Sequence, residues 1–252
     1  MTERTDRVEP GIAIGAADGG PDTPAMEEEV VERERRLGRS TAFFSIATGL
    51  SRVAGLVREI FAASYFGVGI QMSAFTIAFL VPNLVRSLFA DAALQAAFVP
   101  VFTEQLERGR KIEAFRLAST LIFAATLVLG LITALFILLA PWVMPLFAPG
   151  YSGAELDLTV SLSRVLFPIL ILLGVSGVVV GILNSYDHFS IPALSPVLWN
   201  LAIIAGLAIG MPMVHSTSAG LYLYAGSIVA GTVLQFLLPL PWLRGLDGRL
   251  HL

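Results

Sequence analysis

Apolar residues gather in six segments along the chain, each close to the roughly 20 residues that a membrane-spanning helix needs. We place these predicted spans at about 41–64, 71–97, 115–140, 159–184, 191–211 and 219–241. The first two are the least apolar, because both carry charged side chains. The pattern predicts an all-α fold, a polytopic membrane helix bundle with about six transmembrane helices.

Prolines and glycines inside these segments indicate how the helices bend and pack. Prolines within or beside the spans predict kinks at Pro82, Pro168, Pro192, Pro196 and Pro239. Glycines recur at four-residue steps in two pairs, Gly177 with Gly181 and Gly206 with Gly210. We expect these pairs to allow close contacts between helices of the bundle rather than to form a dimer face.

In the first predicted span, the polar residues lie on one broad side of the helix. Ser51, Gly55, Arg58 and Ala62 share one face, and Arg52 and Glu59 form the neighbouring stripe. The opposite side consists of Phe, Ile, Leu and Val residues. This pattern is typical of a helix with its back to lipid and its front to a cavity.

The second predicted span has a polar face of its own. Asn83, Ser87, Asp91 and Gln95 repeat at four-residue steps, and Arg86 lies beside this stripe. Pro82 directly precedes the stripe and predicts a bend where the polarity begins.

Three arginines, Arg52, Arg58 and Arg86, therefore lie inside predicted spans. An arginine at the bilayer centre costs roughly 2.5–3.5 kcal/mol on insertion scales, so such residues commonly mark a substrate path. Because guanidinium presents a fork of donors that matches phosphate, arginines that converge on one cavity would attract an anionic group.

The residues alone leave other interpretations open. Arg52, Arg58 and Glu59 could snorkel to a membrane boundary, and Arg86 could form a structural ion pair with Asp91. The carboxylates of Glu59 and Asp91 are better explained as partners of arginines than as proton carriers. Arg164, at the start of the fourth span, is better explained by snorkelling.

The ends of the chain differ from the apolar body. Residues 1–39 are rich in Gly, Pro and charge and predict a charged cytoplasmic tail, disordered over about 1–25 with a short helix over 26–39. Residues 243–252 predict a short cytoplasmic end. Arginine and lysine precede the first span, lie between the second and third, and follow the sixth, so we expect both termini in the cytoplasm.

Composition excludes several classes of protein. Hydrophobic residues make up 56% of the 252 residues and charged residues only 14%, against about 25% in soluble domains. The chain has no cysteine, and its three histidines lack metal-ligand spacing. Without a phosphate-cradling loop or a nucleophile paired with a base, we expect neither an enzyme nor a cofactor, metal or nucleic-acid partner.

Several motifs resemble those of the MurJ/MviN-type lipid II flippases. They are SRVAGLVRE at 51–59, VPNLVR at 81–86, LFAD at 88–91, QAAFVP at 95–100, APW at 140–142, APGY at 148–151, FP at 167–168, GILN at 181–184 and FSIPA at 189–193. They occur in order over about 40–242. The family belongs to the multidrug/oligosaccharidyl-lipid/polysaccharide exporter superfamily, whose members have two lobes across a central cavity.

The resemblance implies a bacterial inner-membrane transporter that moves undecaprenyl-pyrophosphate-linked muropeptide, lipid II, from the inner to the outer leaflet by alternating access. It implies that 40–242 form a six-helix N-terminal lobe and that Arg52, Arg58 and Arg86 line the cavity and bind the pyrophosphate. Ser51, Glu59, Asn83, Ser87 and Asp91 would support them. We expect Arg52, Arg58 and Arg86 on the open side of an exposed half-cavity.

The resemblance has limits that leave alternatives. Ser73 stands where many relatives carry an Asp, so a role for that carboxylate does not transfer. The second lobe is absent from this sequence, which implies a missing C-terminal lobe or a partner chain. The chain could instead move another polyprenyl-linked saccharide, or be a single-lobe membrane scaffold that does not transport.

Overall fold

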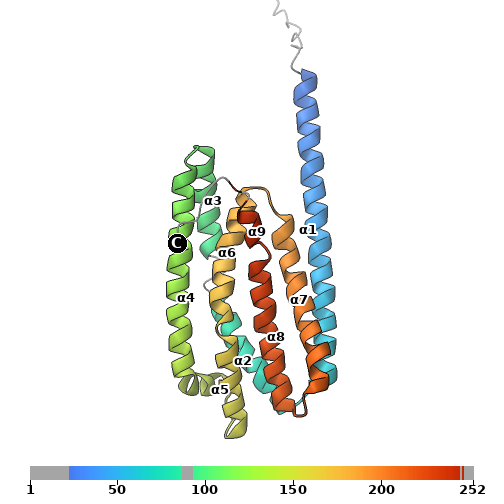
Figure 1. The fold of residues 1–252 in the computed structure, drawn as a ribbon, viewed down its shortest axis with the longest axis vertical. Helices are drawn as coiled ribbons and strands as arrows, with labels where there is room; N and C mark the ends of the chain where they lie inside the picture. Colours follow the sequence, from blue (N-terminus) through green and yellow to red (C-terminus); the bar gives the residue numbers. More distant parts are fainter. Residues whose placement is uncertain (1–22, 87–92, 245, 247–252) are drawn as a thin grey trace, which may run out of the picture. The chain divides into compact units, whose positions relative to one another are not determined.

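The computed structural model describes residues 23–86, 93–244 and 246, and within these residues all regular structure is helical (Figure 1). The elements are α1 Thr23–Phe66, α2 Ile70–Arg86, α3 Ala93–Glu107, α4 Lys111–Phe147, α5 Ala154–Leu166, α6 Ile169–Ser185, α7 Ser190–Gly210, η2 Met211–Met213, α8 Thr217–Leu237 and α9 Leu240–Leu243. The predicted all-α fold is confirmed.

Four stretches of the described residues are long and apolar enough to cross a membrane, namely Lys111–Phe147, Ala154–Ser185, Ser190–Met213 and Thr217–Leu243. They correspond to the last four predicted spans and make the chain a multi-pass membrane protein. The first predicted span lies within α1, which carries charges that lower its hydropathy. The second lies in α2 and α3, and residues 87–92 between them fall outside the described part.

The chain divides into two compact units, Met1–Thr41 and Ala42–Leu252. In the first unit, residues 1–22 of the predicted tail lie outside the described residues, and the chain is helical from Thr23 onward as the beginning of α1. In the second unit, most of the predicted end at 243–252 also lies outside the described residues.

Helices of the second unit pack in pairs that bring distant segments together. Close contacts join α7 with α8, α2 with α5, α4 with α6, and α6 with α8. In Figure 1, α4, α6, α8 and α7 accordingly follow one another from left to right. Short connections join α6 to α7 and α7 to α8, so these successive spans run antiparallel to one another.

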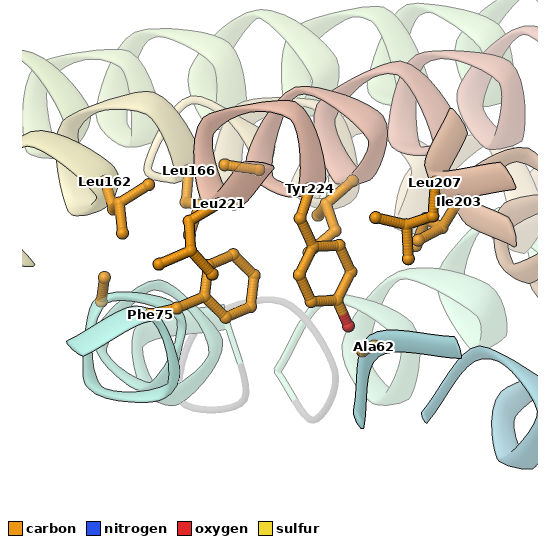
Figure 2. Packing of buried hydrophobic residues seen from close by; sticks show 11 residues of the cluster. Ala62, Phe75, Leu162, Leu166, Ile203, Leu207, Leu221 and Tyr224 are labelled. Atoms are coloured by element: carbon orange, nitrogen blue, oxygen red, sulfur yellow. The ribbon is translucent and has the colours of Figure 1, made fainter. Parts of the chain in front are cut away.

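A buried aromatic and aliphatic cluster joins α1 to the rest of this unit. The ring of Tyr224 on α8 stacks on Phe75 of α2, with centroids 4.4 Å apart, and on Phe66 of α1 at 5.9 Å. Figure 2 shows the hydroxyl end of Tyr224 directed toward Ala62 of α1, which is fully buried. This cluster anchors the end of α1 between α8 and α2.

The fourth predicted span is divided into two helices. Pro168 has no N–H to donate, and the next residues bond three positions back, Leu170 to the Phe167 carbonyl at 3.1 Å and Ile171 to that of Pro168 at 3.2 Å. The predicted kink at Pro168 is therefore confirmed, and it separates α5 from α6.

Gly206 and Gly210, one of the predicted pairs, lie where α7 and α8 approach closely. A Cβ at Gly206 of α7 would stand 2.2 Å from the Ser227 hydroxyl of α8, and one at Gly210 would stand 2.6 Å from Leu223. These glycines serve packing inside the bundle, as predicted.

Replacement of Gly206 by alanine is expected to lower the free energy of unfolding by about 1–3 kcal/mol, because the new methyl group must displace Ser227 at the α7–α8 contact. Gly226→Ala on α8 is the matched control, since a Cβ there meets nothing within 4 Å. Denaturant titration in detergent micelles measures both variants. Equal stability of the two would contradict the close contact.

Candidate functional site

The polar stripe of α1 packs against α7. The Asn200 side-chain amide of α7 donates to the Ser51 carbonyl at 3.4 Å, and its Oδ1 lies 3.8 Å from where a Cβ of Gly55 would stand. Arg58, one turn further, lies over the ring of Trp199. These contacts leave Ser51, Gly55 and Arg58 half-buried beside α7, and the open half-cavity stays a prediction.

Arg58 is the most enclosed of the predicted charged side chains that the structure describes. Its side chain is 17% exposed, and its guanidinium carbon lies 4.9 Å from the centroid of Trp199. The terminal Nη2 donates to the carboxylate of Glu59, which is itself 58% exposed. The Nε–H is buried and has no hydrogen-bond acceptor within the described part of the chain.

Trp199 is fixed by α8 on its other side. Its indole N–H donates to the Thr232 hydroxyl at 3.1 Å, and that hydroxyl donates to the Ile228 carbonyl at 2.8 Å. Gly231 leaves room for the ring, because a Cβ there would lie 3.2 Å from the indole Cδ1. Arg58, Trp199 and Thr232 therefore form a continuous contact across three helices.

Sequence reasoning missed Trp199 and Asn200. The available signal was a Trp–Asn pair in the middle of an otherwise aliphatic predicted span. Asn200 is 5% exposed, and its Oδ1 has no hydrogen-bond partner among the described residues. Two polar atoms without partners, this oxygen and the Arg58 Nε, thus belong to the same α1–α7 contact.

The remaining predicted site residues are less closely grouped or fall outside the description. Arg52 on α1 and Asn83 on α2 are exposed. Arg86 ends α2 and Gln95 lies in α3, but the structure describes only their backbone. Ser87 and Asp91 lie outside the described residues. The convergence of Arg86 with Arg52 and Arg58 stays a prediction.

Arg164 has a hydrogen-bond partner on another helix, which the predicted snorkelling did not include. Its Nε donates to the carbonyl of Ile137 on α4 at 3.0 Å. Pro141 stands four residues after Ile137 within the same helix and cannot donate to that carbonyl. Arg164 therefore satisfies the acceptor that Pro141 leaves free, while the rest of its side chain remains exposed.

Comparison with known proteins supplies the family. Residues 62–252 match the family described as lipid II flippase MurJ. The chain belongs to the lipid II flippase MurJ family. A MurJ relative from Burkholderia cenocepacia, named a lipid II flippase, is 35% identical over 202 residues, which are 79% of this chain and 39% of the relative. A probable lipid II flippase MurJ of Rhizobium tropici is 38% identical over 64% of this chain and 31% of that protein.

Solved structures agree with the MurJ assignment. A lipid II flippase MurJ in an inward closed conformation superposes with a TM-score of 0.67 at 27% identity, over 82% of this chain and 43% of that one. A superfamily transporter from Pyrococcus furiosus superposes with a TM-score of 0.65 at 17% identity, a likeness of fold alone. The chain spans about two fifths of the length of the curated MurJ relatives that it matches.

Proposed function

We propose that this chain is the N-terminal lobe of a lipid II flippase, a transporter rather than an enzyme. It would move undecaprenyl-pyrophosphate-linked muropeptide from the inner to the outer leaflet of the bacterial inner membrane. The observation that carries the proposal is membership of the MurJ family. The matched relatives are named as lipid II flippases, which favours lipid II over other polyprenyl-linked saccharides.

The site we propose for the pyrophosphate is built around Arg58, with Arg52 and Arg86 as further contacts. Support comes from the state of the Arg58 guanidinium, which carries a buried N–H without an acceptor beside an ion pair to an exposed carboxylate. An anion at this guanidinium would be held strongly, because solvent screens a partly buried charge less than an exposed one. Because Glu59 is exposed, a phosphate would displace its carboxylate from Arg58 without leaving a buried, unpaired charge.

The movement we propose is alternating access between this lobe and a second lobe, supplied in the same protein or by a partner chain. Lobes that rock around a site near the bilayer midplane expose that site to each side in turn. The helices of this lobe move together in this scheme, because interlocked contacts such as those between α7 and α8 resist internal sliding.

A cell-based assay tests the proposal. Cells depleted of their own lipid II flippase would express this chain together with the second lobe of a relative, and an externally added enzyme that cleaves lipid II would report its outer-leaflet fraction. We expect outer-leaflet lipid II in these cells. The relative cut into the same two pieces is the control. If the cut relative restores transport and this chain with that lobe does not, the proposal fails.

The topology implied by this function gives a separate prediction. Because the chain contains no cysteine, single cysteines introduced by Arg110→Cys and Ser152→Cys report each loop cleanly. With the N-terminus in the cytoplasm, a membrane-impermeant maleimide added to intact cells should label the cysteine at 152 and spare the one at 110. Lysis should make both reactive. The reverse pattern in intact cells would invert the proposed orientation.

A further inference from the structure

We propose that Trp199 is a positioning residue that holds the Arg58 guanidinium in place to receive an anion. This inference rests on the proposed function, because it concerns how the proposed pyrophosphate site is organised. Trp199 on α7 acts through Arg58 on α1, and Thr232 on α8 orients the indole ring.

The contact between Arg58 and Trp199 has the geometry of a cation–π interaction. The guanidinium carbon lies 4.9 Å from the ring centroid, within the roughly 6 Å range of cation–π attraction, for which indole is the best ring. This attraction uses the ring face and consumes no N–H donor. Trp199 can therefore fix Arg58 without using any of its N–H donors, and the buried Nε–H has no acceptor within the described residues.

The indole ring of Trp199 itself has little freedom to move. The hydrogen bond from its N–H to Thr232 fixes the rotation of the indole, and the gap at Gly231 admits the ring edge. Thr232 is 1% exposed and is anchored in turn to the Ile228 carbonyl of its own helix. Because α8 fixes the indole ring, the ring in turn restricts where the Arg58 guanidinium can lie. A loosely packed aromatic residue would not restrict it.

The contact with Trp199 stabilises the charge of Arg58. A largely enclosed guanidinium with one exposed carboxylate as partner carries a desolvation penalty. Aromatic contact offsets part of this penalty without neutralising the charge, so the attraction for an incoming anion remains. A carboxylate in place of the ring would stabilise Arg58 equally well but would compete with the phosphate for its donors.

Simple helix packing is the competing explanation for Trp199, and fluorination separates the two. Fluorine atoms on the indole withdraw electrons from the ring and weaken cation–π attraction stepwise while hardly changing its shape. The test uses the full chain in lipid nanodiscs with Trp142→Phe and Trp242→Phe, so that Trp199 is the only tryptophan. Both replaced residues are exposed, on α4 and α9 respectively. The probe is undecaprenyl pyrophosphate, with undecaprenol as the ligand lacking the anion.

We expect the dissociation constant for undecaprenyl pyrophosphate to rise with each added fluorine, to about tenfold for the fully substituted ring. Thr232→Val, which removes the hydroxyl that orients the ring, should weaken binding by a smaller factor. In an Arg58→Ala background the fluorine dependence should vanish.

Binding that is unchanged by fluorination overturns the role of Trp199 while leaving the proposed pyrophosphate site standing. A stepwise effect that persists without Arg58 also overturns it, because the ring would then act on something else. If the unfluorinated chain binds the pyrophosphate lipid no better than undecaprenol, the proposed site fails, and the inference fails with it.

Discussion

Arg58→Ala is expected to raise the dissociation constant for undecaprenyl pyrophosphate by about tenfold to a hundredfold. The estimate follows from the loss of hydrogen bonds between charged groups, at about 1.5–3 kcal/mol, with tenfold for every 1.4 kcal/mol. The dissociation constant of Arg58→Lys should fall between those of the unsubstituted chain and Arg58→Ala. An ammonium keeps the charge but lacks the Nε–H and the planar group that stacks on Trp199. Titration of the lipid into nanodiscs that contain the chain measures these constants.

The control for overall charge is Arg110→Ala. Arg110 precedes α4 and pairs with Glu113 at 3.6 Å on an exposed surface, so its removal should leave the binding constant unchanged. Circular dichroism should show the same helix content in all three variants. Equal weakening by Arg58→Ala and Arg110→Ala would mean that the lipid responds to net charge, and would contradict a specific site at Arg58.

The second large effect concerns Arg164 and Pro141. Arg164→Leu is expected to lower the free energy of unfolding by about 1–2 kcal/mol, because the Ile137 carbonyl on α4 would lose its donor. In a Pro141→Ala background the same substitution should cost far less, since the N–H of an alanine at 141 would donate to that carbonyl along the helix. A double-mutant cycle in mixed micelles gives the coupling free energy.

The cycle separates this hydrogen bond from other roles of Arg164. Loss of lipid or solvent contacts by the exposed part of the side chain would appear equally with proline or alanine at position 141 and would cancel in the coupling term. A coupling energy near zero would contradict the pairing of Arg164 with the carbonyl that Pro141 frees.

The sequence predicted the helices well where periodicity and apolar length were strong. The last four spans, the kink at Pro168 and the packing role of Gly206 and Gly210 agree with the structure. Each depends on information carried within one or two helical turns. Proline removes a donor wherever it stands in a helix, and glycine permits close approach wherever two helices meet.

Helical phase grouped Ser51, Gly55, Arg58 and Ala62 correctly but could not identify what that face meets. Polarity predicted an open cavity, which stays a prediction, and the structure adds Asn200 and Trp199 as partners of part of this face. The amphipathic pattern of a membrane helix distinguishes polar from apolar sides. It does not distinguish a water-filled cavity from a neighbouring helix with polar side chains.

Contacts between residues far apart in the chain were beyond the local pattern. Arg58 on α1 and Trp199 on α7 are far apart in the sequence but in contact in the fold. The hydrogen bond between Arg164 and Ile137 likewise joins two helices, α5 and α4. The sequence alone predicts that Arg164 lies near a membrane boundary. Only the fold shows that a proline-freed carbonyl stands within its reach.

A contact between the Arg58 guanidinium and the substrate phosphorus tests the central claim most directly. Solid-state NMR on the chain labelled with ¹⁵N-arginine, in membranes containing undecaprenyl pyrophosphate, measures ¹⁵N–³¹P dipolar coupling. We predict a coupling that corresponds to hydrogen-bonding contact and that disappears in Arg58→Lys. The account would be contradicted if the lipid binds and its phosphorus couples only to other arginines, so that no coupling is lost in Arg58→Lys.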